Sequence, residues 1–306
     1  MGMNADIAEE SSGIRTKLAI LGNQGLVMVT VTPHGGLFGP RSITWRVHTE
    51  PLGPTAAVRA FQLQALHPRT IRGIAQNFLL DDPEEARARL RRVQDFVTVR
   101  TFGTLEQAEQ AAERVRRAQA RLVGLDPDTG TLFRVHDEEN LRWVHCAEVS
   151  SYLEIALRAG LPLTPAEQDA YVAEQRLSAR LVGLRDVPGD TAELAACLDD
   201  MRPRLAATPE ARDALRRGMT PRPSLRPALR SHTAAGALAY ATLPGWAREM
   251  YGHSGDAAAE HAAGAVLKAL RRAAAAMPER LVAPEVRAAR ALMRPAADAA
   301  GADVAA

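Results

Sequence analysis

The sequence lacks several features that membrane, secreted and nucleic-acid-binding proteins require. No uninterrupted apolar run reaches about 18 residues and the first ten residues are acidic, which argues against a membrane span and a secretion signal. The two cysteines, Cys146 and Cys197, lack the spacing of a zinc site or a redox motif, so we interpret them as small core residues of a reduced, cytoplasmic protein. The 38 basic and 36 acidic residues leave a net charge of +2 with no basic block. This balance argues against nucleic acid as the main partner.

The motifs of several enzyme classes are also missing. The chain has no Gly-rich phosphate loop, no His-Glu-x-x-His, no Gly-x-Ser-x-Gly and no cysteine pair at ligand spacing. These absences argue against phosphoryl transfer, zinc hydrolysis and α/β-hydrolase chemistry.

What the sequence does contain is helical periodicity. Apolar residues recur with a period of 3.6 and almost never alternate, and 306 residues with 46% hydrophobic content can form a large core. We predict an all-α fold with one domain of about ten helices, and a division into an N-terminal arm (1–35), a helical domain (36–253) and Ala-rich C-terminal helices with a tail (254–306).

Local signals mark some of the element boundaries. Asp137 and Gly160 punctuate the clearest helix, and Thr164 before Pro165 is a helix cap. The stretch 126–130 predicts a turn, and Gly124 is expected to close the helix before it. The Gly- and Pro-rich stretch 33–54 predicts a structured loop, and the β-branched run in 17–32 predicts a helix or an extended arm.

One helix carries polar side chains on an apolar face. In 137–160, Leu141, His145, Glu148, Tyr152 and Ile155 are separated by four, three, four and three residues, which places them along one face. Burial would oblige the polar members to bond each other or a ligand, and would move their pKa values toward the range useful for acid/base catalysis. The alternative is a satisfied His/Glu pair that holds helices together.

An arginine run precedes this helix. Arg87, Arg89, Arg91 and Arg92 cover more than one helical face, so some are expected to point inward. An inward arginine suits a carboxylate or a propionate because its fork binds two oxygens, whereas most arginine runs are solvated.

Six blocks of sequence, in this order, resemble the family of mpaB-like oxygenases and latex-clearing rubber oxygenases over about residues 36–252. The blocks are GLFGPRSITWRVHTEP, AFQLQALHP, ARLRRVQDFVTVRTFGTLEQAEQAAERVRRAQARLVGLDPDTG, LRWVHCAEVSSYL, LTPAEQDAYVAEQ and LPGWAREMYG. The resemblance implies an all-helical fold with a globin-like core that holds haem b, and attack by O₂ on apolar substrates such as polyisoprene or prenyl chains.

The resemblance also assigns site residues. Arg89 and Arg92 match the family's haem-side arginine segment, where Val93 replaces threonine; Gln119 stands in the place of the axial histidine. His145 matches the histidine of the family's Trp-Val-His-Ala-Thr segment, with Ala147 at its threonine. Because an amide is a poor iron ligand, His145 becomes the first candidate for metal ligation, and the replaced threonines make the former haem pocket more apolar.

Three functions follow from these features. The first is a haem-dependent oxygenase or related oxidoreductase of specialised metabolism, acting on a hydrophobic small molecule with His145 or a neighbouring residue as iron ligand. The second is a haem-free relative in which His145 and Glu148, with Tyr152 beside them, catalyse an isomerisation, cyclisation or elimination. The third is a protein that only binds a lipophilic ligand in the same cavity.

Overall fold

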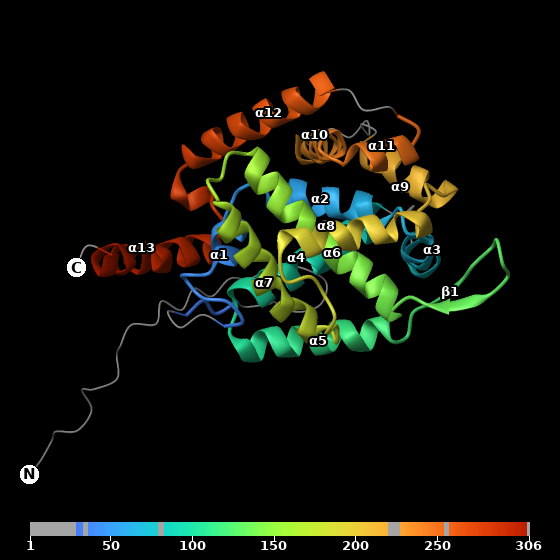
Figure 1. Cartoon of the computed structure of the whole chain (residues 1–306), viewed down its shortest axis with the longest axis horizontal. Helices are drawn as coiled ribbons and strands as arrows, with labels where there is room; N and C mark the ends of the chain where they lie inside the picture. The colour runs from blue at the N-terminus through green and yellow to red at the C-terminus, as the bar shows by residue number, and fades with distance from the viewer. Residues whose placement is uncertain (1–28, 33–35, 79–82, 220–226, 254–256, 305–306) are drawn as a thin grey trace, which may run out of the picture.

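A computed structural model describes residues 29–32, 36–78, 83–219, 227–253 and 257–304, and this part of the chain is almost entirely helical (Figure 1). It contains thirteen α-helices and one two-stranded sheet, which confirms the all-α prediction with more helices than the ten expected. The α-helices, in chain order, are α1 (Ile43–His48), α2 (Gly53–Gln64), α3 (Pro68–Asn77), α4 (Pro83–Phe102), α5 (Leu105–Gln119), α6 (Glu138–Arg158), α7 (Pro165–Leu181), α8 (Thr191–Met201), α9 (Pro209–Met219), α10 (Pro227–Ala241), α11 (Gly245–Met250), α12 (Ala257–Ala275) and α13 (Pro284–Val304). The strands are β1 (Val123–Leu125) and β2 (Leu132–Arg134), and two 3-10 turns are η1 (Arg202–Arg204) and η2 (Glu279–Leu281).

Helix α6 lies at the centre of the molecule and packs against α1, α2, α3, α7, α8 and α12 (Figure 1). It begins and ends where its sequence predicts. The Asp137 carboxylate accepts a hydrogen bond from the backbone N–H of Asn140 at 2.8 Å, and Gly160, with φ of 85°, follows the last turn. Helix α7 begins with the predicted cap, a reciprocal pair of bonds between Thr164 and Glu167.

The short helix α1 corrects the prediction of a loop over 33–54. The Ser42 side chain caps it, and Trp45 is completely buried and donates its indole N–H to the Thr101 carbonyl oxygen at 2.8 Å. Because the helix is stabilised by burial of Trp45 against α4, its Gly- and Pro-rich surroundings misled the prediction. Of the run 17–32, residues 17–28 lie outside the described part, and 29–32 are neither helix nor strand.

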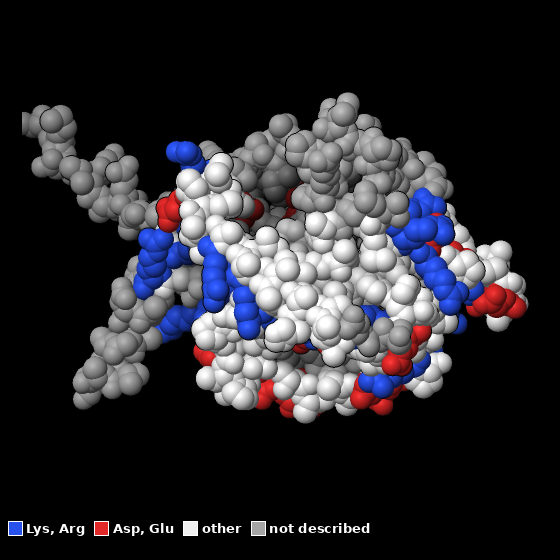
Figure 2. Space-filling model, turned by 90° about the horizontal axis from the view of Figure 1, so that it is seen from above, with Lys and Arg blue, Asp and Glu red and all other residues white. Residues whose placement is uncertain are grey.

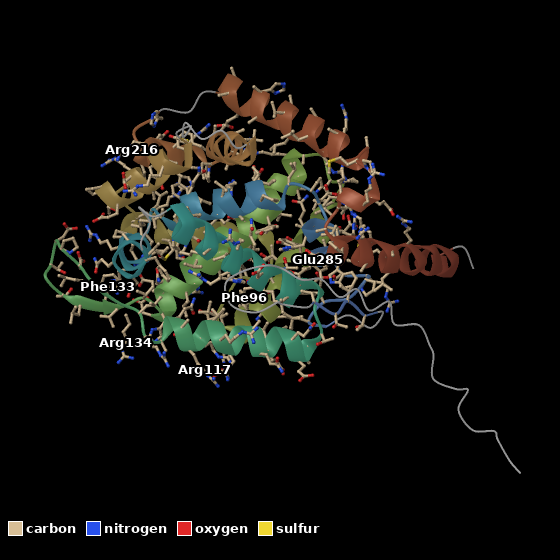
Figure 3. The ribbon with its side chains drawn as sticks, turned by 180° about the vertical axis from the view of Figure 1, so that it is seen from behind. Phe96, Arg117, Phe133, Arg134, Arg216 and Glu285 are labelled. Carbon is tan, nitrogen blue, oxygen red and sulfur yellow. The ribbon has the colours of Figure 1, made fainter. Side chains whose placement is uncertain are left out.

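The β1–β2 hairpin corrects the prediction that Gly124 closes a helix. Helix α5 ends at Gln119, and Gly124 pairs with Phe133 across the hairpin, which lies at the edge of the molecule (Figures 1 and 3). The Phe133 ring covers Gly124 so closely that an added Cβ would lie 2.3 Å from a ring atom. The predicted turn at 126–130 is confirmed, because Gly130 has a φ of 67° and donates its N–H to the Asp126 carbonyl oxygen.

The C-terminal helices pack against the rest of the fold. Leu267 of α12 is completely buried, and Arg271 forms an ion pair with Glu50 at 2.6 Å.

Seen from above, the middle of the molecular surface carries few charged side chains (Figure 2). Among the described helices, none is both long and apolar enough to cross a bilayer.

The close approach of the Phe133 ring makes Gly124 a sensitive position. We expect Gly124→Ala to lower the free energy of unfolding by about 1–3 kcal/mol, because the ring has to move away from the added methyl group. Gly264→Ala is the control: an added Cβ there meets nothing within 4 Å in α12, so the alanine should stabilise the helix by up to about 1 kcal/mol. Urea denaturation measures both values, and an unchanged stability of Gly124→Ala would contradict the packing of the hairpin.

Candidate functional site

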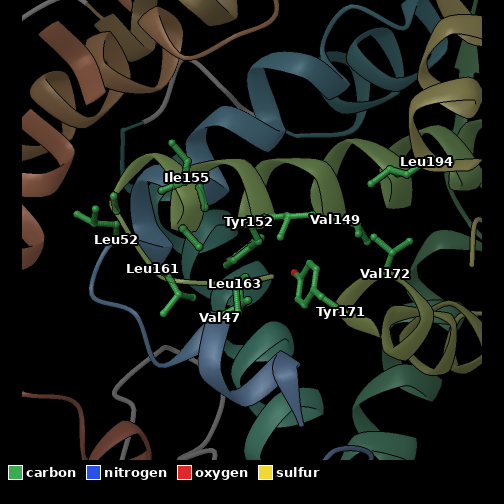
Figure 4. Packing of buried hydrophobic residues seen from close by; sticks show 14 of the residues in the cluster. Val47, Leu52, Val149, Tyr152, Ile155, Leu161, Leu163, Tyr171, Val172 and Leu194 are labelled. Carbon is green, nitrogen blue, oxygen red and sulfur yellow. The ribbon is translucent and has the colours of Figure 1, made fainter. Parts of the chain in front are cut away.

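Three of the predicted site residues lie together inside the molecule. His145, Glu148 and Tyr152 project from α6 toward Arg100 of α4. Figure 4 shows Tyr152 of α6 and Tyr171 of α7 close to each other, with Val47 of α1 below Tyr152. We call His48, Arg100, His145, Glu148, Tyr152 and Tyr171 the Arg100 cluster.

Arg100 is the fixed charge of the cluster. Its side chain is 7% exposed, and its guanidinium forms an ion pair with the Glu148 carboxylate and lies 5.3 Å from the centre of the Phe96 ring. Phe96 lies one turn earlier on α4 (Figure 3). The Arg100 Nε–H has no hydrogen-bond partner among the described residues. A buried donor without a partner costs free energy, and a bound ligand or water is one way to supply the missing acceptor.

His48 joins the cluster from α1. Its imidazole stacks on the Tyr152 ring at 4.4 Å between centroids and shares a hydrogen bond of 3.2 Å with the Tyr171 hydroxyl. The Glu174 carboxylate of α7 orients this helix by accepting hydrogen bonds from the first backbone N–H groups of α1, at 3.1 and 2.7 Å. Helix α7 therefore positions both His48 and its partner Tyr171.

Three members of the cluster were not predicted from the sequence: His48, Arg100 and Tyr171. The Ser42 cap three residues before Trp45 was the local signal for a helix that would carry His48 inward. Arg100 follows β-branched residues near the end of α4, and its sequence neighbourhood carries no comparable signal.

Burial and the Arg100 charge determine the protonation of the cluster. Both lower the pKa of His48 and of His145 to about 3, with burial the larger cause. Burial, with the Glu148 charge, raises the pKa of Tyr152 and of Tyr171. The imidazoles are therefore neutral and the phenols protonated at neutral pH. This corrects the expectation for His145, whose pKa moves away from the range of an acid/base catalyst because the nearest charge is positive.

Of the residues that the resemblance assigned to the haem site, Arg89, Arg92 and Gln119 lie outside the Arg100 cluster, and only His145 belongs to it. Arg89 points inward, with its guanidinium 5.2 Å from the Phe78 ring and 5.9 Å from the Phe61 ring, and burial lowers its pKa to about 10. Arg92 lies on the exposed side of α4. Gln119 is the last residue of α5 and is half-buried.

The two replaced threonine positions do not share a pocket. Val93 is 42% exposed, whereas Ala147 is completely buried in a different part of the core, beside Leu63 and Trp143. The expectation that Val93 and Ala147 line one apolar pocket is therefore wrong. Val93 faces solvent on α4, whereas Ala147 lies on the side of α6 that packs against α2.

Two surface grooves of about 830 and 820 Å³ occur in the described part of the chain. The first lies along α6 and α8, the second along α5 and α7, and no residue of the Arg100 cluster lines either one. The described residues contain no group of three or more His, Cys, Asp or Glu side chains that could hold a metal ion.

Comparison with known proteins supports the resemblance noted in the sequence. Residues 45–297 match the family model of the catalytic domain of ER-bound oxygenase mpaB/B′ and rubber oxygenase. No curated protein and no solved structure matches the chain significantly.

The lowered pKa values predict acid-sensitive stability. The unfolded chain protonates these imidazoles near pH 6.5 and the folded protein near pH 3, so the unfolded state binds more protons between these values and stability falls as the pH falls. Each histidine contributes up to about 1.4 kcal/mol per pH unit to the slope of the free energy of unfolding against pH. We expect His145→Asn to show a shallower loss of stability than the wild type between pH 6 and 4 in urea denaturation. His261→Asn, at an exposed position on α12, should keep the wild-type slope, and equal slopes in all three proteins would contradict the buried neutral state.

Proposed function

The chain belongs to the family of ER-bound oxygenase mpaB/B′ and rubber oxygenase catalytic domains, and we propose that it is an oxygenase-like enzyme that converts a hydrophobic small molecule at the Arg100 cluster. The observation that carries the choice of site is the buried Arg100 guanidinium, which has an unpartnered Nε–H and lies among neutral imidazoles and phenols. The apolar core around it, with Val47, Val97 and Val149, supports an apolar substrate.

The cluster is suited to stabilise negative charge that develops on a substrate oxygen. A guanidinium in a region with little water interacts strongly with an anion, and donors that are already in place need no reorganisation during the reaction. The phenol of Tyr171 and the N–H groups of neutral imidazoles are donors of this kind.

Glu148 is the proton acceptor in this proposal. Its carboxylate contacts Arg100 and is 19% exposed, so it is the member that can exchange a proton with solvent. Tyr152, one turn further along α6, stays protonated and can donate a hydrogen bond or a proton to the substrate. Proton transfer of this kind begins isomerisation, cyclisation and elimination reactions.

The family positions for haem b do not fit the group in this chain. Gln119 offers an amide in place of an imidazole, Arg92 faces solvent, and the Arg89 guanidinium is occupied by the Phe61 and Phe78 rings. We therefore assign no step to haem.

A second candidate is a haem-dependent oxygenase with His145 as the iron ligand. The neutral state of the His145 imidazole favours it, because a metal binds the unprotonated nitrogen. The Arg100 charge opposes it, since the same charge that disfavours a proton on His145 also disfavours a metal cation.

Turnover tests the first candidate. Incubation with a panel of isoprenoid and other apolar compounds in air, followed by mass spectrometry, distinguishes added oxygen from a rearrangement that leaves the mass unchanged. We expect Glu148→Gln to lower the rate about 100-fold or more and Arg100→Lys by a similar factor, because proton transfer and anion stabilisation are lost.

Arg59→Lys is the matched control for these variants. Arg59 is also buried, but its Nε–H donates to the Thr242 carbonyl oxygen and its Nη1 donates to the Ser151 hydroxyl, outside the cluster. It should lose stability without a comparable loss of turnover. Folded Glu148→Gln protein with wild-type turnover would exclude Glu148 as the proton acceptor.

A visible absorption spectrum with iron analysis tests the second candidate. Protein purified from cells supplied with haem precursor should show no stoichiometric Soret band if the acid/base proposal is right. A stoichiometric band that His145→Ala alters would establish the haem-dependent function, and a band unaffected by His145→Ala would remove His145 as the ligand.

A further inference from the structure

The structure brings the two cysteines together, although 51 positions separate them in the sequence. The Cys146 Sγ of α6 and the Cys197 Sγ of α8 lie 3.0 Å apart, and both are free thiols. A disulfide bond is about 2.05 Å long, so the sulfur atoms need to move together by about one ångström. Cys146 belongs to the core and Cys197 packs against it, as interpreted from the sequence, and the fold also brings their sulfur atoms into contact, which the sequence spacing did not indicate.

The two thiols differ in access to solvent. Cys146 is completely buried in the core, whereas Cys197 is half-buried and lines the groove along α6 and α8. This groove has a volume of about 830 Å³ and is open to the surface. A small oxidant can therefore reach Cys197 first, with Cys146 directly behind it.

The surroundings also favour a reactive Cys197. The hydrogen bond with the Cys146 thiol and, to a smaller extent, the Arg142 charge lower the pKa of Cys197 to about 7 against the opposing effect of burial, while the same hydrogen bond and burial raise the pKa of Cys146. Asp186 and Asp200 act in the opposite direction on Cys197, and Arg142 forms an ion pair with Asp186 at 2.8 Å. A thiolate is the nucleophilic form of cysteine, so the accessible member of the pair is also the more nucleophilic one.

We propose that Cys146 and Cys197 form a redox-active dithiol that a small hydroperoxide, entering through the groove along α6 and α8, oxidises to an intramolecular disulfide. The Cys197 sulfur attacks a peroxide oxygen, the O–O bond breaks, and the products are a sulfenic acid and an alcohol, or water from hydrogen peroxide. The Cys146 sulfur then attacks Cys197, the S–S bond forms, the S–O bond breaks, and water leaves with the Cys146 proton. In total, two thiols lose two electrons and two protons, and the hydroperoxide is reduced to an alcohol and water.

The disulfide would join α6 to α8 one residue away from His145. Oxidation of the thiols that face the groove would therefore act on the helix that carries His145, Glu148 and Tyr152, three of the six residues of the Arg100 cluster. The proposal is independent of the proposed function, because it rests on the thiol pair alone.

Hydrogen peroxide treatment of the reduced full-length chain tests the proposal. Because the chain has two cysteines, thiol titration should fall from two per chain to none, and the intact mass should fall by two hydrogens. Trypsin cleaves next to Arg142 and Arg185, which places the cysteines in separate peptides, so the disulfide should appear as a cross-linked pair. Oxidation of the folded chain should be about tenfold or more faster than in urea, because the fold holds the thiols together.

Single variants separate the roles of the two thiols. Cys146→Ser should accumulate a sulfenic acid on Cys197 that dimedone traps, whereas Cys197→Ser should keep its remaining thiol unmodified under the same treatment. Wild-type protein that keeps both thiols, or that forms disulfides only between chains, would overturn the proposal. Equal oxidation rates in the folded chain and in urea would overturn it as well.

Discussion

The partly buried ion pair between Arg100 and Glu148 is the interaction on which the rest of the centre depends. A guanidinium inside an apolar core is stable only when a counter-charge and hydrogen bonds replace its water, and Glu148 supplies that charge from α6. The pair therefore joins α4 to the central helix. The Arg100 charge also helps to keep His48 and His145 neutral. Removing Glu148 would leave the Arg100 charge uncompensated. The contact therefore stabilises the fold and also positions the proposed proton acceptor.

The chain matches the catalytic-domain model of its family over residues 45–297, while the positions that the resemblance assigned to haem have other surroundings. Arg89 lies near two phenylalanine rings, Val93 faces solvent, and Ala147 fills a core position beside Leu63 and Trp143. The cluster that replaces them as the candidate site uses α1, α4, α6 and α7. A family match therefore defines the catalytic-domain type, and the chemistry has to be argued from the residues that this chain brings together.

The parts that could be predicted from the sequence are those that local interactions determine. The helix after Asp137 and the cap at Thr164 follow from short-range bonds, and the stripe of His145, Glu148 and Tyr152 follows from helical periodicity. Contacts between distant segments decided the rest. Burial of Trp45 stabilises α1, the Phe133 ring requires Gly124 in a strand, and the approach of Cys146 to Cys197 depends on how α6 packs on α8. Arg100 was not predicted either, because its burial depends on contacts with distant segments and its sequence neighbours do not indicate it.

An NMR titration of the histidine imidazoles tests the central claim most directly. The resonances of His48 and His145, assigned with single asparagine variants, should remain those of neutral imidazole down to about pH 4, and Arg100→Met should raise the pKa of both because it removes the neighbouring charge. Titration of both histidines near their ordinary pKa of about 6.5, with no change in Arg100→Met, would contradict the account of a buried, charge-controlled centre.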